Sequence, residues 1–227
     1  LQTGKAEQNL VLQQMNTSGM KVKLLPVLPF LNNPEAFSIV TTTIGNGNSE
    51  EKQAAYGALL NWKNADAIPY LYSVIEDGRF AASREKTFNT YLEQVSKSDS
   101  PDDEKLLLIR KLLPVCQSDQ EKLQLIRSAR TIKTFLSLVF VSDFLDDEEL
   151  SAAAALAAMK IMLPTPDEDN GLQGTFVRSV AEKVMKKISG ADSQYYKIDI
   201  REFLEKMTEG EGFVPIFNGK DLSGWQG

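Results

Sequence analysis

The sequence contains no histidine and one cysteine among its 227 residues. Without histidine, Ser-His-Asp and Cys-His nucleophile activation, general-base catalysis by imidazole and every histidine-containing zinc site are excluded. Cys116 cannot form an intrachain disulfide, and it cannot build a thiolate metal cluster alone. Its neighbours Leu112, Leu113 and Val115 are apolar. We therefore expect a small buried apolar residue rather than a reactive thiol.

Long apolar runs and an excess of positive charge are absent as well. The longest mostly apolar stretches, 23–31 and 134–140, are far shorter than the roughly 20 residues that a membrane-spanning helix needs. Thirty-one acidic against 25 basic residues give a net charge of −6, which repels phosphate backbones and anionic lipid. We expect neither a membrane span nor a nucleic-acid partner. With 42% apolar residues, the chain can bury the core of one large or two small domains.

Glycine is absent from Arg79 to Asn170, although the chain has 14 glycines. Hairpins and β-sandwiches depend on glycine-bearing turns, so this interval favours helices joined by short polar connections. Helical periodicity supports this view, because apolar residues between 54 and 62 recur at the spacing of one buried helical face. Helix-start signals occur at Asn33-Pro34, Ser49-Glu50-Glu51, Asn64-Ala65-Asp66, Ser83-Arg84-Glu85, Ser100-Pro101-Asp102, Ser118-Asp119-Gln120 and Asp146 to Glu149.

Four further prolines lie deeper in the expected helices. They are Pro26, Pro29, Pro69 and Pro114. Each removes one backbone donor and crowds the preceding turn, so we expect bends or early breaks there.

The predicted helices recur in pairs. The dipeptide Glu-Lys begins at 51, 85 and 121, spacings of 34 and 36 residues, and each copy opens an amphipathic helix. A helical pair at this period is typical of an α-solenoid. Over residues 19–188 the pattern resembles degenerate HEAT repeats. Tetratricopeptide repeats have a similar period, but their Trp, Leu-Gly and Tyr signature is not found at a constant offset; a non-repetitive helical bundle is the other alternative.

The composition changes abruptly at Gly210, and the segment 210–227 contains five of the 14 glycines. The run 213–217 is short, apolar and extended, and Pro215 restricts it to an edge or to the start of a strand. Asn218-Gly219 is a strong turn signal. We therefore expect a helical domain over 1–209 and the beginning of a β-domain over 210–227.

This tail resembles the opening of the 3-keto-disaccharide hydrolase family, Gly-Phe-x-x-Leu-Phe-Asn-Gly-Lys-Asp-Leu-x-Gly-Trp. The match covers residues 212–225, with Ile216 in place of the usual leucine. The resemblance implies a concanavalin-like β-sandwich that acts on carbohydrate, mostly in exported bacterial proteins and sometimes after helical repeats. Catalytic carboxylates, metal ligands and most of the sugar-binding surface would then lie beyond Gly227. In the tail itself, Trp225 and Asp221 suit a pyranose chemically, but a core tryptophan and a turn explain them better.

Acidic pairs and basic clusters in the helical part have simpler explanations than catalysis. The groups 102–104 and 146–149 lie at helix starts, where acids complement the helix dipole. The acidic run 167–171 does not follow the EF-hand register, so we interpret it as a polar linker. The basic residues Arg110, Lys111, Arg127, Arg130 and Lys133 could face an acidic partner, or they are ordinary solvated helix faces. Residues 171–174 lack the spacing of a phosphate loop.

These observations predict an all-α chain: an α-solenoid of HEAT-like helical pairs, followed by a short β segment that begins a truncated β-sandwich. We expect a non-catalytic scaffold or interaction region of a larger carbohydrate-active protein, with no catalytic, metal or cofactor residue in these 227 positions. The alternative is a free-standing module that binds a peptide or helix on its concave face. An enzyme within the helices would have only paired carboxylates to use. The chain begins at Leu1 with neither an initiator methionine nor a basic-then-apolar leader, so we expect a processed chain or an excised fragment. The resemblance of the tail implies a location in the bacterial periplasm or at the cell surface.

Overall fold

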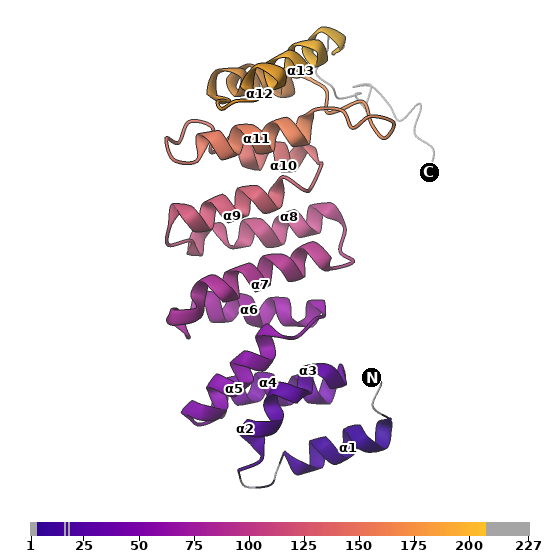
Figure 1. Cartoon of the computed structure of the whole chain (residues 1–227), viewed down its shortest axis with the longest axis vertical. Coiled ribbons are helices and arrows are strands. Elements are labelled where there is room, and N and C mark those ends of the chain that lie inside the picture. Colours follow the sequence, from indigo (N-terminus) through magenta and orange to yellow (C-terminus); the bar gives the residue numbers. More distant parts are fainter. Residues whose placement is uncertain (1–3, 16, 18, 208–227) are drawn as a thin grey trace, which may run out of the picture. The chain divides into compact units, whose positions relative to one another are not determined.

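The computed structural model describes residues 4–15, 17 and 19–207 (Figure 1). Throughout these residues the regular secondary structure is helical, which confirms the predicted all-α class. None of the helices in this part is long and apolar enough to cross a bilayer. The predicted boundary at 209/210 and the predicted β segment over 210–227 lie outside the described residues.

The chain divides into two compact units, Leu1–Asp99 and Ser100–Gly227, where the sequence predicts a single helical domain over 1–209. The first unit contains α1 (Lys5–Gln14), α2 (Lys21–Leu24), η1 (Leu25–Val27), α3 (Leu28–Leu31), α4 (Pro34–Asn46), α5 (Ser49–Leu60), η2 (Ala65–Ala67), α6 (Ile68–Glu76), η3 (Ala81–Ser83) and α7 (Arg84–Lys97). The second contains α8 (Asp102–Lys111), η4 (Leu113–Val115), α9 (Asp119–Ala129), α10 (Phe135–Ser142), α11 (Ser151–Met162), α12 (Thr175–Lys187) and α13 (Ser193–Lys206).

In the first unit, helices that follow one another in the chain pack side by side: α4 on α5, and α6 on α7 (Figure 1). Large aromatic side chains fill the core, among them Tyr56 and Trp62, each about 1% exposed. The Tyr56 hydroxyl is hydrogen-bonded to the hydroxyl of Thr87, and the Gln94 side chain donates to the Trp62 carbonyl oxygen. These two buried hydrogen bonds attach α5 and the residues after it to α7.

In the second unit, α11 is the central helix. It contacts α9, α10 and α12, and α12 in turn contacts α13 (Figure 1). Four alanines of α11, at 154, 155, 157 and 158, are almost fully buried, because small side chains let three helices approach one backbone. At the next interface, the Arg178 guanidinium donates to the Leu204 carbonyl oxygen at 3.4 Å and so joins α12 to α13.

The helix starts lie near the predicted groups, but only three of the seven groups cap through the predicted side chain. Side chains of Asn33, Asn64 and Ser118 accept hydrogen bonds from the first turns of their helices, as expected from N-caps. Ser83 precedes α7 without a side-chain cap, and Pro101 rather than Ser100 is the N-cap residue of α8. α5 is capped by Asn48, one residue before the predicted group. α11 begins only at Ser151, because Asp147 accepts from the amides of residues 149 and 150 in a separate turn before the helix.

The four deeper prolines mark early breaks, as predicted. At three of the breaks, a new helical piece begins directly after the previous one ends. Pro26 lies in η1, which follows α2; Pro29 lies in α3, which follows η1; and Pro69 lies in α6, which follows η2. The fourth proline lies in η4, after the end of α8. In every case the proline occupies the first or second position of the new piece, where a missing N–H costs no intrahelical bond.

Candidate binding site

The segment 163–174, which joins α11 to α12, is held in place by one aspartate. The carboxylate of Asp169 accepts from the Gly171 amide at 2.6 Å and from the Thr165 amide at 3.4 Å. It also pairs with Lys133 Nζ at 2.7 Å, and the same ammonium donates to Thr165 Oγ1 at 2.7 Å. Lys133 lies just before α10, so the segment is attached to a different part of its unit and is more than the polar linker that the sequence predicts.

Electrostatics keep this attachment intact at neutral pH. The hydrogen bond from Lys133, followed by that from the Gly171 amide, lowers the pKa of Asp169 to about 2. The carboxylate therefore stays ionised over the physiological range, and its pairing with Lys133 persists.

Gly171 allows the segment to fold back onto the end of α11. Its φ is +74°, a backbone conformation that side chains disfavour. A Cβ here would lie 2.6 Å from the Met162 carbonyl oxygen and 2.9 Å from Cε2 of Phe203. The next amide, that of Leu172, donates to the same Met162 oxygen at 2.9 Å. The close approach brings the segment against α13.

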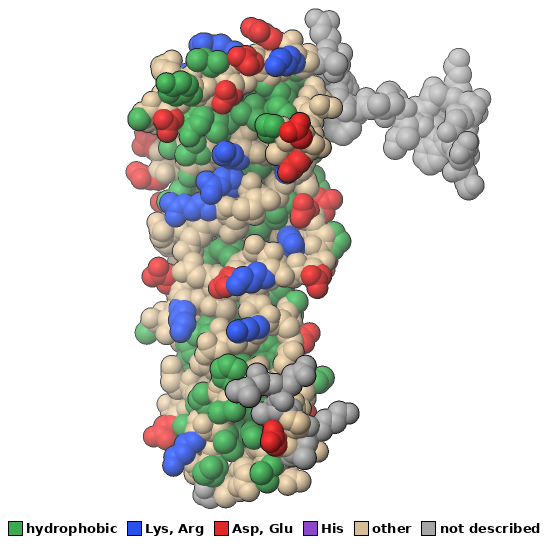
Figure 2. All heavy atoms as spheres, turned by 45° about the vertical axis from the view of Figure 1, so that its right-hand side comes forward, with side chains coloured by type: hydrophobic (Ala, Val, Ile, Leu, Met, Phe, Trp, Pro, Cys, Tyr) green, Lys and Arg blue, Asp and Glu red, His purple; other side chains and the backbone are tan. Residues whose placement is uncertain are grey.

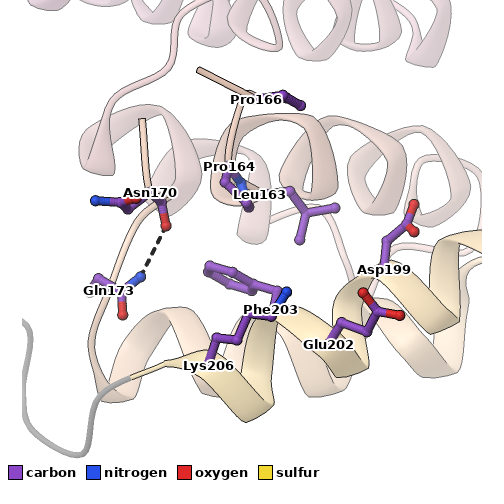
Figure 3. A pocket seen from close by; sticks show the side chains of 9 residues that line it. All are labelled: Leu163, Pro164, Pro166, Asn170, Gln173, Asp199, Glu202, Phe203 and Lys206. Atoms are coloured by element: carbon purple, nitrogen blue, oxygen red, sulfur yellow. Dashed lines mark hydrogen bonds between the residues drawn. The ribbon is translucent and has the colours of Figure 1, made fainter. Parts of the chain in front are cut away.

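Between this segment and α13 lies a cavity of about 800 Å³ (Figure 3). This volume is in the range of pockets that bind small ligands. The lining residues come from the end of α11, the 163–174 segment and one face of α13: Leu163, Pro164, Pro166, Asn170, Gln173, Asp199, Glu202, Phe203 and Lys206.

The lining combines four chemical kinds of side chain: apolar, acidic, carboxamide and, at Lys206, basic. Leu163, the two prolines and the ring of Phe203 supply apolar surface, and Phe203 itself is 5% exposed. Two carboxylates, Asp199 and Glu202, lie together at one end of the cavity on successive turns of α13 (Figure 3). At the other end, the Gln173 side chain donates to the Asn170 carbonyl oxygen at 3.2 Å (Figure 3). Within the described residues neither of these carboxylates has an ion pair or a hydrogen bond.

The first unit has a smaller hollow of about 480 Å³, lined by Pro29, Phe30, Asn32, Asn61, Lys63 and Asn64. Phe30 is 74% exposed, and it is one of several large apolar side chains that are exposed in the described residues. Asn64 donates to Asn32 at 3.4 Å, which links two lining residues. Nearby in sequence, the buried indole Nε1 of Trp62 has no acceptor within the described part of the chain.

Of the two acidic groups, a helix start explains 102–104 but not 146–149, which precedes α11 and contributes no acid to its first turn. Asp102, Asp103 and Glu104 form the first turn of α8, next to its unpaired amides. Within the described ranges, no group of three or more cysteine, aspartate or glutamate side chains is arranged to hold a metal ion. In particular, the carboxylate oxygens of Asp169 accept hydrogen bonds from Lys133 and from backbone amides.

The basic side chains of the middle helices are distributed over the surface. Arg110, Arg127 and Arg130 are exposed, while Lys133 is partly buried against Asp169. Figure 2 shows acidic and basic side chains interspersed on the visible faces of both units rather than gathered in a single field. Cys116 is half-buried rather than fully buried, and its thiol is within 3.4 Å of the Leu112 carbonyl oxygen.

Sequence reasoning missed the cavity. Its lining combines a segment that we interpreted as a linker with an outer face of α13, and no motif joins the two. The one feature of the sequence that indicates this region is the length of the connection between two helices. Twelve residues, with two prolines and two glycines, separate α11 from α12. Such a long connection inside a helical repeat is commonly functional.

The sugar-binding candidates Trp225 and Asp221 lie outside the described residues. Comparisons of the chain with protein-family models, with curated proteins and with solved structures give no match.

Proposed function

We propose that residues 1–209 form a non-catalytic α-solenoid of HEAT-like helical pairs, the scaffold and interaction region of a larger carbohydrate-active protein. The regular alternation of helices carries the proposal. The helices that pack on each other as pairs are α4 with α5, α6 with α7, α8 with α9, and α10 with α11. The second helices of these pairs begin at 49, 84, 119 and 151, which are 35, 35 and 32 residues apart. Their first helices begin at 34, 68, 102 and 135. A helical pair repeated at this period is the unit of an α-solenoid.

Contacts inside the second unit support the stacking of pairs. There α8 contacts α10 and α9 contacts α11, so each helix touches the corresponding helix of the next pair. Contacts of α10 with α11 and of α11 with α12 join the two layers. Solenoids have this pattern because every repeat contacts only its neighbours, and their exposed faces serve to bind or position other molecules.

The carbohydrate part of the proposal rests on the resemblance of residues 212–225 to the opening of the 3-keto-disaccharide hydrolase family. The resemblance implies that the parent protein hydrolyses glycosidic bonds or 3-keto-glycosides in the bacterial periplasm or at the cell surface. Catalytic groups would lie after Gly227, and the helical region would position them near a glycan or a protein partner.

Hydrolysis of 3-keto-glycosides by two forms of the protein tests this function. We expect turnover by the native polypeptide with everything that follows Gly227, and none by the 227-residue chain. If a chain that ends at Glu209 still turned over substrate, the catalytic groups would lie within the helices, and the scaffold proposal would be wrong.

A free-standing interaction module is the second candidate function. The 74% exposed Phe30 beside the hollow of the first unit favours it, because such an aromatic side chain is a common anchor for a partner. Charge reversal of Arg127 and Arg130 separates the candidates. Loss of a protein partner with unchanged hydrolysis by the native polypeptide would support the module, and retention of both would support the scaffold.

A further inference from the structure

We propose that the cavity between the 163–174 segment and α13 binds an extended peptide segment in which an arginine or lysine is flanked by apolar residues. This site goes beyond the scaffold role and does not depend on the resemblance of the tail. It lies entirely within the second unit.

The wall formed by the 163–174 segment is preformed. Asp169 holds it through Lys133 and two backbone amides, and the Leu172 amide ties it to the end of α11. Opposite it, α13 is attached to α12 by the Arg178 hydrogen bond. A ligand therefore does not have to meet the entropic cost of ordering these walls.

The two carboxylates select a cation. Asp199 and Glu202 are exposed, lie on successive turns of α13 and lack a partner within the described residues. Figure 3 shows both at the same end of the cavity, beside the apolar surface. A guanidinium or ammonium group on an apolar stem fits this arrangement, because its charge can pair with the acids while its methylene groups cover the apolar lining.

The other lining residues indicate that the cationic group belongs to a side chain of a peptide. Leu163, Pro164 and Pro166 offer apolar contacts to neighbouring side chains. The carboxamides of Asn170 and Gln173 combine donors and an acceptor, which matches the main-chain groups of an extended segment. Lys206 lies one turn beyond Glu202 and disfavours a second cation, so the site prefers one basic residue with apolar neighbours.

The test uses two synthetic peptides with the full 227-residue chain. One probe is acetyl-Leu-Arg-Leu-Pro-amide, and the other has citrulline, which keeps the shape of arginine without its charge. Backbone amide shifts are followed by NMR during titration. We expect the arginine peptide to shift the amides of 163–173 and of α13, and the citrulline peptide to bind about fivefold to tenfold more weakly.

Charge-removing variants complete the test. Asp199→Asn with Glu202→Gln should weaken binding of the arginine peptide about fivefold to tenfold, whereas Lys206→Gln should strengthen it. Glu182→Gln is the matched control, because this exposed glutamate lies on α12 away from the lining.

Three outcomes would overturn the proposal: equal affinity for both peptides, an equal loss with Glu182→Gln, or no amide shifts in 163–173 and α13. The last of these includes the case in which residues 208–227 themselves occupy the cavity.

Discussion

At the scale of single residues, Gly171 shows how one missing side chain shapes the candidate site. The sequence places this glycine in a polar connection, where we expect nothing beyond a turn. The structure adds a specific requirement, because the space of a Cβ is taken by the Met162 carbonyl oxygen and the Phe203 ring. Neither of these contacts is visible in sequence, since Phe203 lies more than thirty positions away.

Gly171→Ala tests that requirement, with Gly78→Ala as its control. Both glycines have positive φ, +74° and +69°, but nothing lies within 4 Å of a Cβ at Gly78. The control should lose about 1 kcal/mol of unfolding free energy for backbone strain alone, and Gly171→Ala about 1–3 kcal/mol more for the clash. Urea unfolding followed by circular dichroism measures both. Equal losses would mean that the fold-back onto Met162 is absent.

At the scale of elements, the sequence predicts helix starts well where a side chain caps them locally. Asn33, Asn64 and Ser118 accept hydrogen bonds from residues two or three positions ahead, and such short-range chemistry is encoded in adjacent residues. The prediction at 146–149 was wrong by several residues, because Asp147 closes a turn instead of starting α11. The two uses of an aspartate look alike in sequence.

The shifted start of α5 gives a prediction at this scale. Asn48 accepts from the Glu51 amide at 3.0 Å, and the Glu51 carboxylate accepts from the Asn48 amide at 3.1 Å. Asn48→Ala should therefore cost about 1 kcal/mol of unfolding free energy. Ser49→Ala, one residue later and within the predicted start group, should cost nothing. A larger loss from Ser49→Ala in denaturant titrations would move the cap back to the residue that the sequence favours.

The 163–174 segment gives a pH-dependent prediction. The folded-state pKa of Asp169, about 2, lies below the ordinary aspartate value near 4, so the unfolded chain takes up the proton first as the pH falls. The stabilising contribution is therefore complete above about pH 5 and is lost between there and pH 2. In the unmodified chain, this loss should lower the melting temperature as the pH falls from about 5 to 2. Asp169→Asn should remove this contribution to the fall in the melting-temperature profile.

Asp167→Asn is the control for that experiment. Asp167 is an exposed carboxylate of the same segment and has no hydrogen bond or ion pair within the described residues. Its replacement should leave the acid limb of the profile unchanged. Identical profiles for Asp169→Asn and the unmodified chain would contradict the pairing with Lys133.

At the scale of the whole molecule, composition and glycine placement were enough to predict an all-α chain. The gap in glycine between 79 and 170 coincides with consecutive helices from α7 to α11. The division at Asp99 was not predicted, because compactness depends on which distant helices touch. The cavity was not predicted for the same reason: its attachment joins Lys133 to Asp169, 36 residues apart.

The intact mass of the native protein in its own cells tests the central claim most directly. A helical scaffold that precedes a complete β-sandwich requires a mass above 25.2 kDa by at least about 15 to 20 kDa, room for on the order of 150 to 200 further residues. Our account predicts such a mass. A native mass near 25.2 kDa would mean that no sandwich follows the tail, and it would contradict a scaffold for a carbohydrate-active domain.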